Sequence, residues 1–259
     1  MPEKTRYRSR QDKDAEREFF DTLAGTGERF APKPAAEYAV VLDTLGIGRD
    51  LSGMRVLEAG CATGDFGVTL AERGATVIGV DLSGGMIDLN RRLNSNVPGY
   101  TAMTGDLEDP SLFEPGTFDT VACFNVLHHF PDIGAVTANF ARWLVSGGVV
   151  WAEEPNGGNP VNRLSKLARA LVKRMSPATL HRKRLSTLNE DRDFTMDEYR
   201  AVFAASGFEC EQATAITVPD SDPDKHGLDA VISSIKETLY TTTEALSRDP
   251  LSRGRYLVF

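Results

Sequence analysis

The chain has little of what an exported or nucleic-acid-binding protein would need. Its 259 residues include three cysteines, Cys61, Cys123 and Cys210, too few and too scattered for a disulfide framework or a zinc knuckle. No apolar run is long enough to span a membrane, and the charged residues 1–18 contain no apolar signal-peptide core. A net charge of −8 argues against a general basic face for nucleic-acid phosphates. We therefore expect a cytoplasmic protein with reduced cysteines and no affinity for nucleic acid.

From residue 54 onward, apolar strand-like runs alternate with helical patterns. Strands are expected at 54–59, 75–80, 99–104, 118–124 and 148–153, and helices at 65–73, 84–94 and 132–145. Strands that alternate with helices pair in parallel through right-handed crossovers, and ligands then bind at the carboxyl ends of the strands. With two later strands, at 208–218 and 256–259, the sequence predicts an α/β fold with a doubly wound, mostly parallel sheet of seven strands.

Three segments lie outside or interrupt this alternation. Residues 1–45 are expected to form an N-terminal helical segment that acts as a lid, with a mobile beginning before residue 19. Residues 46–259 are expected to form the main domain. Helical insertions at 157–193 and 219–250 would complete the lid over the carboxyl edge of the sheet.

The first insertion is strongly basic. From Arg163 to Arg184 it contains eight Lys or Arg residues and no Asp or Glu. Apolar residues recur there at spacings of three and four, which predicts an amphipathic helix with a basic face. Two interpretations stay open. The charges are either solvated on a lid helix, or they attract an anionic substrate, a carrier domain or a membrane surface.

A strand, a tight turn and a helix are predicted at Met54–Gly67, the stretch around which the other segments are arranged. Glycines at such a turn permit a positive φ and the close approach of a ligand, and the free N–H groups of the new helix attract polar groups. A dinucleotide-binding turn needs Gly-x-Gly-x-x-Gly, but Ala62 stands where the middle glycine would be. Glu58, at the end of the strand, would repel a pyrophosphate and suits a cationic ligand instead.

This stretch resembles motif I of the class I S-adenosylmethionine-dependent methyltransferases, and four further segments agree in order. They are Asp81 after Val-Ile-Gly-Val, Asp106 in Thr-Gly-Asp-Leu-Glu-Asp-Pro, the run Phe118–Pro131 with its Leu-His-His-Phe-Pro end, and Ser-Gly-Gly at 146–148. The resemblance covers roughly residues 30–155. It implies the Rossmann-like methyltransferase fold, methyltransferase activity and S-adenosylmethionine as the cofactor.

The resemblance also implies a cofactor site. Asp81 would accept hydrogen bonds from both ribose hydroxyls and Asp106 from the adenine amino group, while Glu58 would supply negative charge near the cationic methionine end. Met86 would cover the adenine face, although a methionine on such a helix is as often a core residue. The full expected set is Glu58, Gly60, Cys61, Gly64, Asp81, Leu82, Met86, Asp106, Leu107 and Asn125.

The expected reaction is an in-line attack of a nucleophile on the sulfonium methyl group. Since that methyl group is already activated, the protein would chiefly orient the reactants. A phenol, an alcohol or a carbon acid must also lose a proton, and His129, His128 and Glu153 stand at the ligand edge as candidate catalytic residues. The alternative for the histidines is a structural hydrogen bond to a loop or to the cofactor. No metal site is expected, because adjacent histidines rarely share one metal ion.

These observations predict a methyltransferase that modifies an oxygen or nitrogen of a small metabolite, anionic or carrier-linked in one version of the hypothesis. One alternative is a methyltransferase for a lipid-like or prenylated substrate, docked peripherally on a membrane through the basic helix at 160–184. Another is an S-adenosylmethionine-binding protein with a non-methylating role. Neither the acceptor nor the oligomeric state follows from the sequence.

Overall fold

Five parallel strands form the centre of the protein, whose computed structural model describes residues 12–27, 35–48, 50–161, 194–216 and 256–258. The sheet order is β3-β2-β1-β4-β5-β7-β6, with β7 antiparallel to both β5 and β6. The strands are β1 (Arg55–Ala59), β2 (Thr76–Asp81), β3 (Tyr100–Thr104), β4 (Phe118–Phe124), β5 (Leu144–Pro155), β6 (Thr214–Ile216) and β7 (Tyr256–Val258). The predicted doubly wound fold is confirmed.

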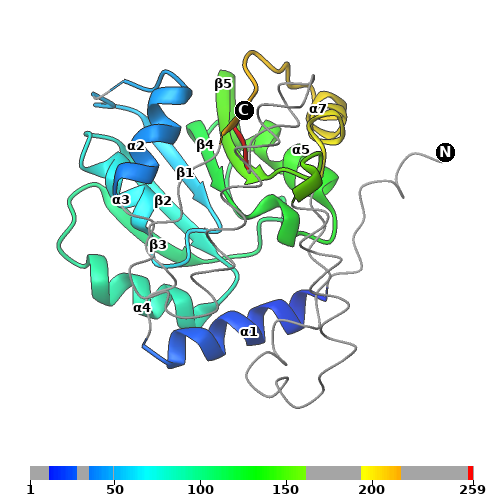
Figure 1. Ribbon diagram of the computed structural model, residues 1–259. Helices are drawn as coiled ribbons and strands as arrows, with labels where there is room; N and C mark the ends of the chain where they lie inside the picture. The colour runs from blue at the N-terminus through cyan, green and yellow to red at the C-terminus, as the bar shows by residue number, and fades with distance from the viewer. Residues whose placement is uncertain (1–11, 28–34, 49, 162–193, 217–255, 259) are drawn as a thin grey trace.

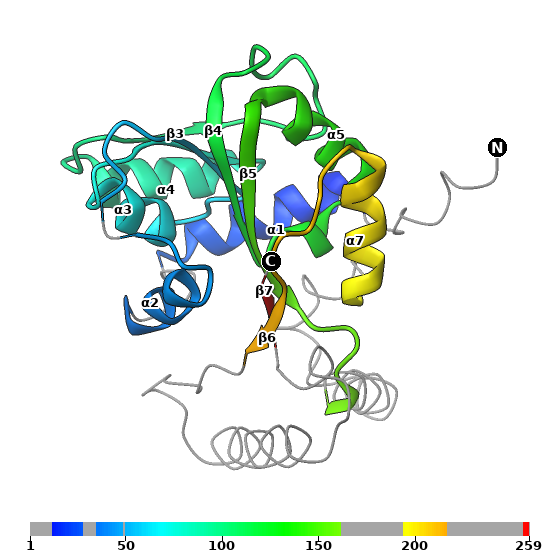
Figure 2. The same cartoon turned by 90° about the horizontal axis from the view of Figure 1, so that it is seen from above.

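Helices cover both faces of this sheet (Figures 1 and 2). On one face lie α2 (Ala35–Thr44), α3 (Asp65–Ala71) and α4 (Gly84–Asn94), and on the other α5 (Ile133–Trp143) and α7 (Met196–Ala205). Successive strand residues point to opposite faces, so Val56 packs in the cluster beneath α2 and α3 while Leu57 packs in the cluster beneath α5 and α7. Both residues are fully buried, which explains why these two neighbouring positions of β1 are both apolar.

The N-terminal segment differs from its prediction. Helix α1 (Lys13–Gly25) begins where the sequence indicated mobile chain, and Asp12 caps it by accepting from the backbone N–H groups of Asp14 and Ala15. The expectation of mobility was therefore wrong for residues 12–18. Mixed charges made these residues resemble solvated chain, but several of them pair with other parts of the fold, as described below.

Helix α1 lies across the carboxyl edge of the sheet, alongside α4 (Figures 1 and 2). The two insertions contribute little to the described structure, because residues 162–193 and 217–255, including the predicted basic helix, lie outside the described residues. Within the described ranges, no helix is both long enough and apolar enough to cross a membrane.

Candidate functional site

The loop between β1 and α3 has an unusual backbone that its small residues permit. Gly60 and Gly64 have φ values of 66° and 81°, and Ala62, a non-glycine residue, has φ 39°. A Cβ atom added to Gly60 would clash with the side chain of Val126, and one added to Gly64 would clash with Tyr100. The protein's own packing therefore requires glycine at these positions, in addition to the ligand approach that the sequence suggested.

A buried polar network supports this loop from behind. One oxygen of Glu58 accepts from the backbone N–H of Gly67 at 2.9 Å, and the other accepts from the Tyr100 hydroxyl at 3.1 Å. The Asn90 amide donates to the Tyr100 oxygen at 3.0 Å and to the carbonyl of Ala62 at 2.8 Å. Burial raises the pKa of Glu58 to about 8. Glu58 is thus largely uncharged at neutral pH in this structure, which weakens its predicted role as a negative charge beside the cofactor.

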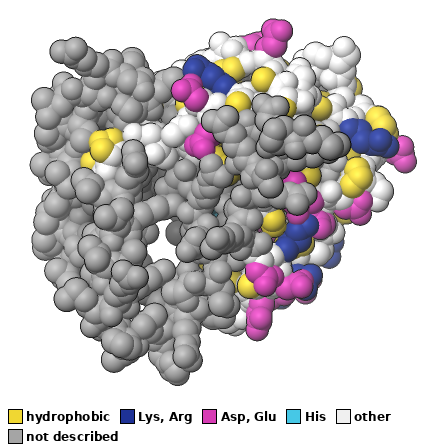
Figure 3. Space-filling model, turned by 90° about the vertical axis from the view of Figure 1, so that its right-hand side faces the viewer, with side chains coloured by type: hydrophobic (Ala, Val, Ile, Leu, Met, Phe, Trp, Pro, Cys, Tyr) yellow, Lys and Arg dark blue, Asp and Glu magenta, His cyan; other side chains and the backbone are white. Residues whose placement is uncertain are grey.

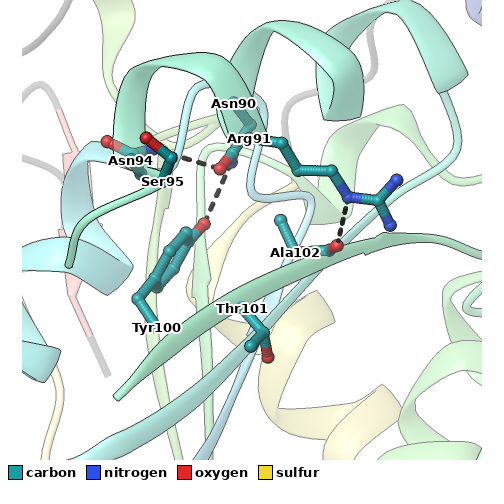
Figure 4. Close-up of a pocket in the computed structure, with 7 residues that line it drawn as sticks. All are labelled: Asn90, Arg91, Asn94, Ser95, Tyr100, Thr101 and Ala102. Carbon is teal, nitrogen blue, oxygen red and sulfur yellow. Dashed lines mark hydrogen bonds between the residues drawn. The ribbon is translucent and has the colours of Figure 1, made fainter. Parts of the chain in front are cut away.

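A pocket of about 330 Å³ adjoins the same network between α4 and β3 (Figure 4). Asn90 and Tyr100 line it, and the Arg91 side chain crosses it to donate to the Ala102 carbonyl at 3.0 Å. None of the predicted cofactor residues lines this pocket. It lies beside the supports of the loop rather than at the carboxyl edge of the sheet.

Two predicted carboxylates lie at that edge. Asp81 ends β2, and its oxygens accept from the backbone N–H groups of Ala62 and Ser83, both at 2.9 Å. Burial raises the pKa of Asp81, while the two backbone bonds and nearby His129 oppose the rise. Asp106 follows β3 and accepts from the Glu108 backbone N–H at 2.9 Å. Both side chains are only partly enclosed, and their roles as ribose and adenine partners stay predictions.

Helix α1 contacts the loops that follow β2 and β3 at this edge. Lys13 binds the Asp106 carboxylate at 2.7 Å and also pairs with Glu108. Asp21 accepts from the Ser83 hydroxyl at 2.6 Å and from the Gly85 backbone N–H at 2.9 Å. Sequence reasoning missed these contacts. The only signal was the i, i+3 and i+8 placement of Lys13, Glu16 and Asp21, which puts them on neighbouring turns of one helix.

Figure 3 shows one side of the molecule, where described acidic side chains lie close to described Lys and Arg side chains. Charges of both signs therefore mix on the visible part of this face. In the residues that the structure describes, no group of three or more His, Cys, Asp or Glu side chains is arranged to hold a metal ion.

Several predicted cofactor residues are core residues instead of open ligand contacts. Met86 is fully buried in a cluster with Ala24 and Leu89, so it takes the core alternative left open by its sequence pattern. Leu107 is 3% exposed and belongs to the main core, whereas Leu82 is partly exposed after β2. Cys61 is buried, and burial raises the pKa of its thiol well above the usual value. An inert small side chain fits Cys61 better than a nucleophile.

The candidate catalytic residues meet at the ends of β4 and β5. A short 3₁₀ helix, η1 (Leu127–His129), carries both histidines, whose rings lie 4.1 Å apart. His129 Nδ1 lies 2.8 Å from a carboxylate oxygen of Glu16 on α1. His128 Nδ1 lies 2.7 Å from a carboxylate oxygen of Glu154. Each histidine thus faces its own carboxylate: Glu16 on α1 faces His129, and Glu154 on β5 faces His128.

Glu153 lies inside the protein, where it bonds to Asn125. It is fully buried, and its carboxylate accepts from the Asn125 side-chain amide at 2.9 Å. The Asn125 backbone N–H donates to the Glu153 carbonyl at 2.7 Å, and Asn125 has a left-handed φ of 54°. Glu153 therefore holds Asn125 in a strained conformation beside the predicted methionine end of the site.

Comparisons with known proteins bear on the family of the chain. Residues 56–148 match the family model described as a methyltransferase domain. The magnesium-protoporphyrin O-methyltransferase of Rhodobacter capsulatus is 41% identical over 97 residues, which are 36% of this chain and 42% of that protein. The ubiquinone biosynthesis O-methyltransferase of Xanthomonas oryzae is 31% identical over 144 residues, which are 55% of this chain and 60% of that protein. The chain thus spans about half the length of these curated relatives.

The solved structure of magnesium protoporphyrin IX methyltransferase from Synechocystis, with bound S-adenosylhomocysteine, is also similar. It has a TM-score of 0.58 and 19% sequence identity, and the match covers 80% of this chain and 94% of that one. At this identity the likeness shows a shared fold.

Proposed function

We propose, on the premise that this chain belongs to the class I S-adenosylmethionine-dependent methyltransferases, that it methylates an oxygen atom of a small molecule. S-adenosylmethionine, when bound, supplies an activated methyl group on a sulfonium. The chain's own residues hold that cofactor, enclose the reacting atoms and take up the proton of the acceptor.

The observation that carries this proposal is the pair of partly enclosed carboxylates at adjacent strand ends. Asp81 lies against the glycine loop through Ala62, and Asp106 lies one strand further along the edge. Ribose hydroxyls and an adenine amino group are donors, and carboxylate oxygens have acceptor capacity beyond the bonds described above. The two carboxylate acceptors therefore fit the donors of the nucleoside part of the cofactor, and the resemblance assigns the same roles to the same residues.

Helix α1 belongs to the N-terminal segment 1–45, which we propose acts as a lid. Its contacts with Asp106, Ser83 and His129 join the lid to a predicted cofactor residue, to the loop after Asp81 and to one of the two candidate histidines. An oxygen acceptor is supported by the two similar proteins, both named O-methyltransferases. A nitrogen acceptor stays the alternative from the sequence. The membrane-docking alternative depends on the basic segment outside the described residues, and a cytoplasmic location stays a prediction.

Titration of the protein with S-adenosylhomocysteine, followed by calorimetry, tests the cofactor site. Asp81→Asn and Asp106→Asn should each weaken binding by about 10–100-fold, because a hydrogen bond to a charged group contributes about 1.5–3 kcal/mol. Asp119→Asn is the matched control, since Asp119 pairs with Arg55 near the start of β1, away from the carboxyl edge. No binding by the unaltered protein, or equal losses in all three variants, would contradict the proposed site.

Methyl transfer itself is tested by incubating the protein with isotopically labelled cofactor and candidate acceptors. The acceptors are magnesium protoporphyrin, a panel of phenols and carboxylic acids, and a metabolite extract. The proposal expects a labelled product that is heavier by one CH₂ group. Cofactor binding without any methylated product from the extract would instead favour the non-methylating alternative.

A further inference from the structure

Glu154, at the end of β5, is a fully buried carboxylate with four polar neighbours. One of its oxygens accepts from the backbone N–H groups of Val126 and Leu127, at 2.8 and 2.7 Å. Its other oxygen lies 2.7 Å from His128 Nδ1 and accepts from the Tyr199 hydroxyl at 3.4 Å. Glu154 therefore joins the sheet, η1 and α7 at one point.

These neighbours decide where the proton between Glu154 and His128 resides. Two backbone N–H groups can only donate, and they occupy one oxygen of Glu154. The remaining oxygen accepts from the Tyr199 hydroxyl, so it faces His128 as an acceptor as well. A neutral imidazole has one donor nitrogen and one acceptor nitrogen. With Nδ1 donating to Glu154, the acceptor lone pair of His128 must be on Nε2.

We propose that Glu154 is a positioning residue that holds His128 in the Nδ1–H tautomer, so that His128 takes the proton of the methyl acceptor through Nε2. This inference rests on the proposed function. The acceptor oxygen forms a bond to the methyl carbon as its proton passes to His128 Nε2. The methyl–sulfur bond breaks with its electron pair on sulfur, and the positive charge of the sulfonium ends on the imidazolium, where Glu154 stabilises it.

The two histidines differ in the element that carries their partner carboxylate. The carboxylate beside His129 belongs to Glu16 on α1, and the His129 side chain is 25% exposed. The carboxylate beside His128 belongs to the central sheet and is fully enclosed, while the His128 side chain is 9% exposed. A base must keep one orientation through each turnover, and a partner on the sheet provides that more rigidly than a partner on a lid helix. The geometry therefore points to His128 as the base and to Glu154 as its support.

Nitrogen-15 NMR of the histidine side chains at neutral pH tests this inference without any acceptor. His128→Gln identifies the His128 signals by their loss. The unaltered protein should show a protonated Nδ1 and an unprotonated Nε2 in His128. In Glu154→Gln the side-chain oxygen still accepts from Val126 and Leu127, but the amide N–H₂ now faces Nδ1, so the proton should move to Nε2. Tyr199→Phe keeps the carboxylate and should keep the original tautomer.

The binding and transfer assays separate this inference from the proposed function. Glu154→Gln should bind S-adenosylhomocysteine as the unaltered protein does, and its turnover should fall about 100-fold or more, as expected when a general base is lost. A proton on Nε2 in the unaltered protein would overturn the inference, even if Glu154→Gln fails to fold. So would an unchanged tautomer in folded Glu154→Gln. Absence of S-adenosylhomocysteine binding by the unaltered protein would contradict the proposed function and leave the tautomer result standing.

Discussion

Replacing Glu58 by Gln should remove a specific pH dependence of stability. Glu58 lies beneath the glycine loop, bonded to Gly67 and Tyr100, and burial raises its pKa from 4.5 to about 8. Glutamine has nearly the same shape as the protonated acid. Its oxygen can accept from the Gly67 backbone N–H, and its amide can donate to the Tyr100 oxygen. The substitution therefore keeps both contacts, with the direction of the Tyr100 hydrogen bond reversed, while removing the titration.

The direction and the size of this pH effect on stability follow from proton linkage. The folded pKa lies above the unfolded one, so the stabilising contribution of Glu58 is complete below pH 4.5 and is lost as pH rises through about 8. Between these values the unfolded chain ionises while the folded chain stays protonated, which costs about 1.4 kcal/mol per pH unit and about 5 kcal/mol in all. For a chain of this size, the melting temperature should fall by about 3–5 °C per pH unit.

The measurement is the melting temperature of both proteins at several pH values from 5 to 9, at constant ionic strength. Glu58→Gln should lack this decline and should become the more stable protein in the upper half of the range. Asp81 also has a raised pKa, but it is present in both proteins, so its effect cancels in the difference between the curves. Parallel curves for the two proteins would refute the reasoning, because Glu58 would then be ionised in the folded state.

Two further substitutions test the loop and the lid. Gly60→Ala should cost about 3 kcal/mol of unfolding free energy, because it combines a left-handed φ with a clash against Val126, whereas Gly46→Ala, with φ 67° and no atom within 4 Å, should cost only about 1 kcal/mol. Denaturant unfolding compares the two, and equal costs would contradict the packing reason. Lys13→Met should increase hydrogen exchange in α1 without affecting the central strands, since it removes the pairs with Asp106 and Glu108. The control Arg17→Met loses only a local pair with Asp14 and should leave α1 protected, so equal exchange in both variants would show that Lys13 does not hold the lid.

The cofactor side of the molecule could be predicted because its determinants are local in the sequence. The residues from Met54 to Asp106 form three consecutive strand–loop units, and parallel pairing brings their carboxyl ends to one edge. Helix α4 has the predicted bounds, Gly84–Asn94, because Ser83 caps it through its side chain. The capping box of Thr195 and Glu198 likewise begins α7. Residues close in the sequence were therefore sufficient to predict each of these strands and helices.

Three features of the site could not be predicted because their partners are distant in the sequence. Glu58 is a buried network residue only because Tyr100, 42 positions later, reaches it. Residues 12–18 are helical partly because Lys13 finds Asp106, 93 positions away. Glu154 supports His128 across 26 positions, and nothing in its sequence surroundings distinguishes it from Glu153. The sequence pattern places both glutamates at the ligand edge, and only the structure shows that Glu153 bonds to Asn125 whereas Glu154 lies against His128.

The same contrast explains why the chain indicates its cofactor more readily than its acceptor. The proposed nucleoside partners, Asp81 and Asp106, lie on consecutive loops of one half of the sheet, where the matched family segment also lies. The proposed acceptor side combines α1, η1 and α7 from three distant parts of the chain, two of them outside that segment. A substrate-specific surface assembled in this way can change without disturbing the cofactor loops at residues other than Lys13 and Asp21, which bond to those loops. Residues on α1 and α7 that contact His129 and Glu154, such as Glu16 and Tyr199, are therefore the positions at which acceptor preference should be altered first.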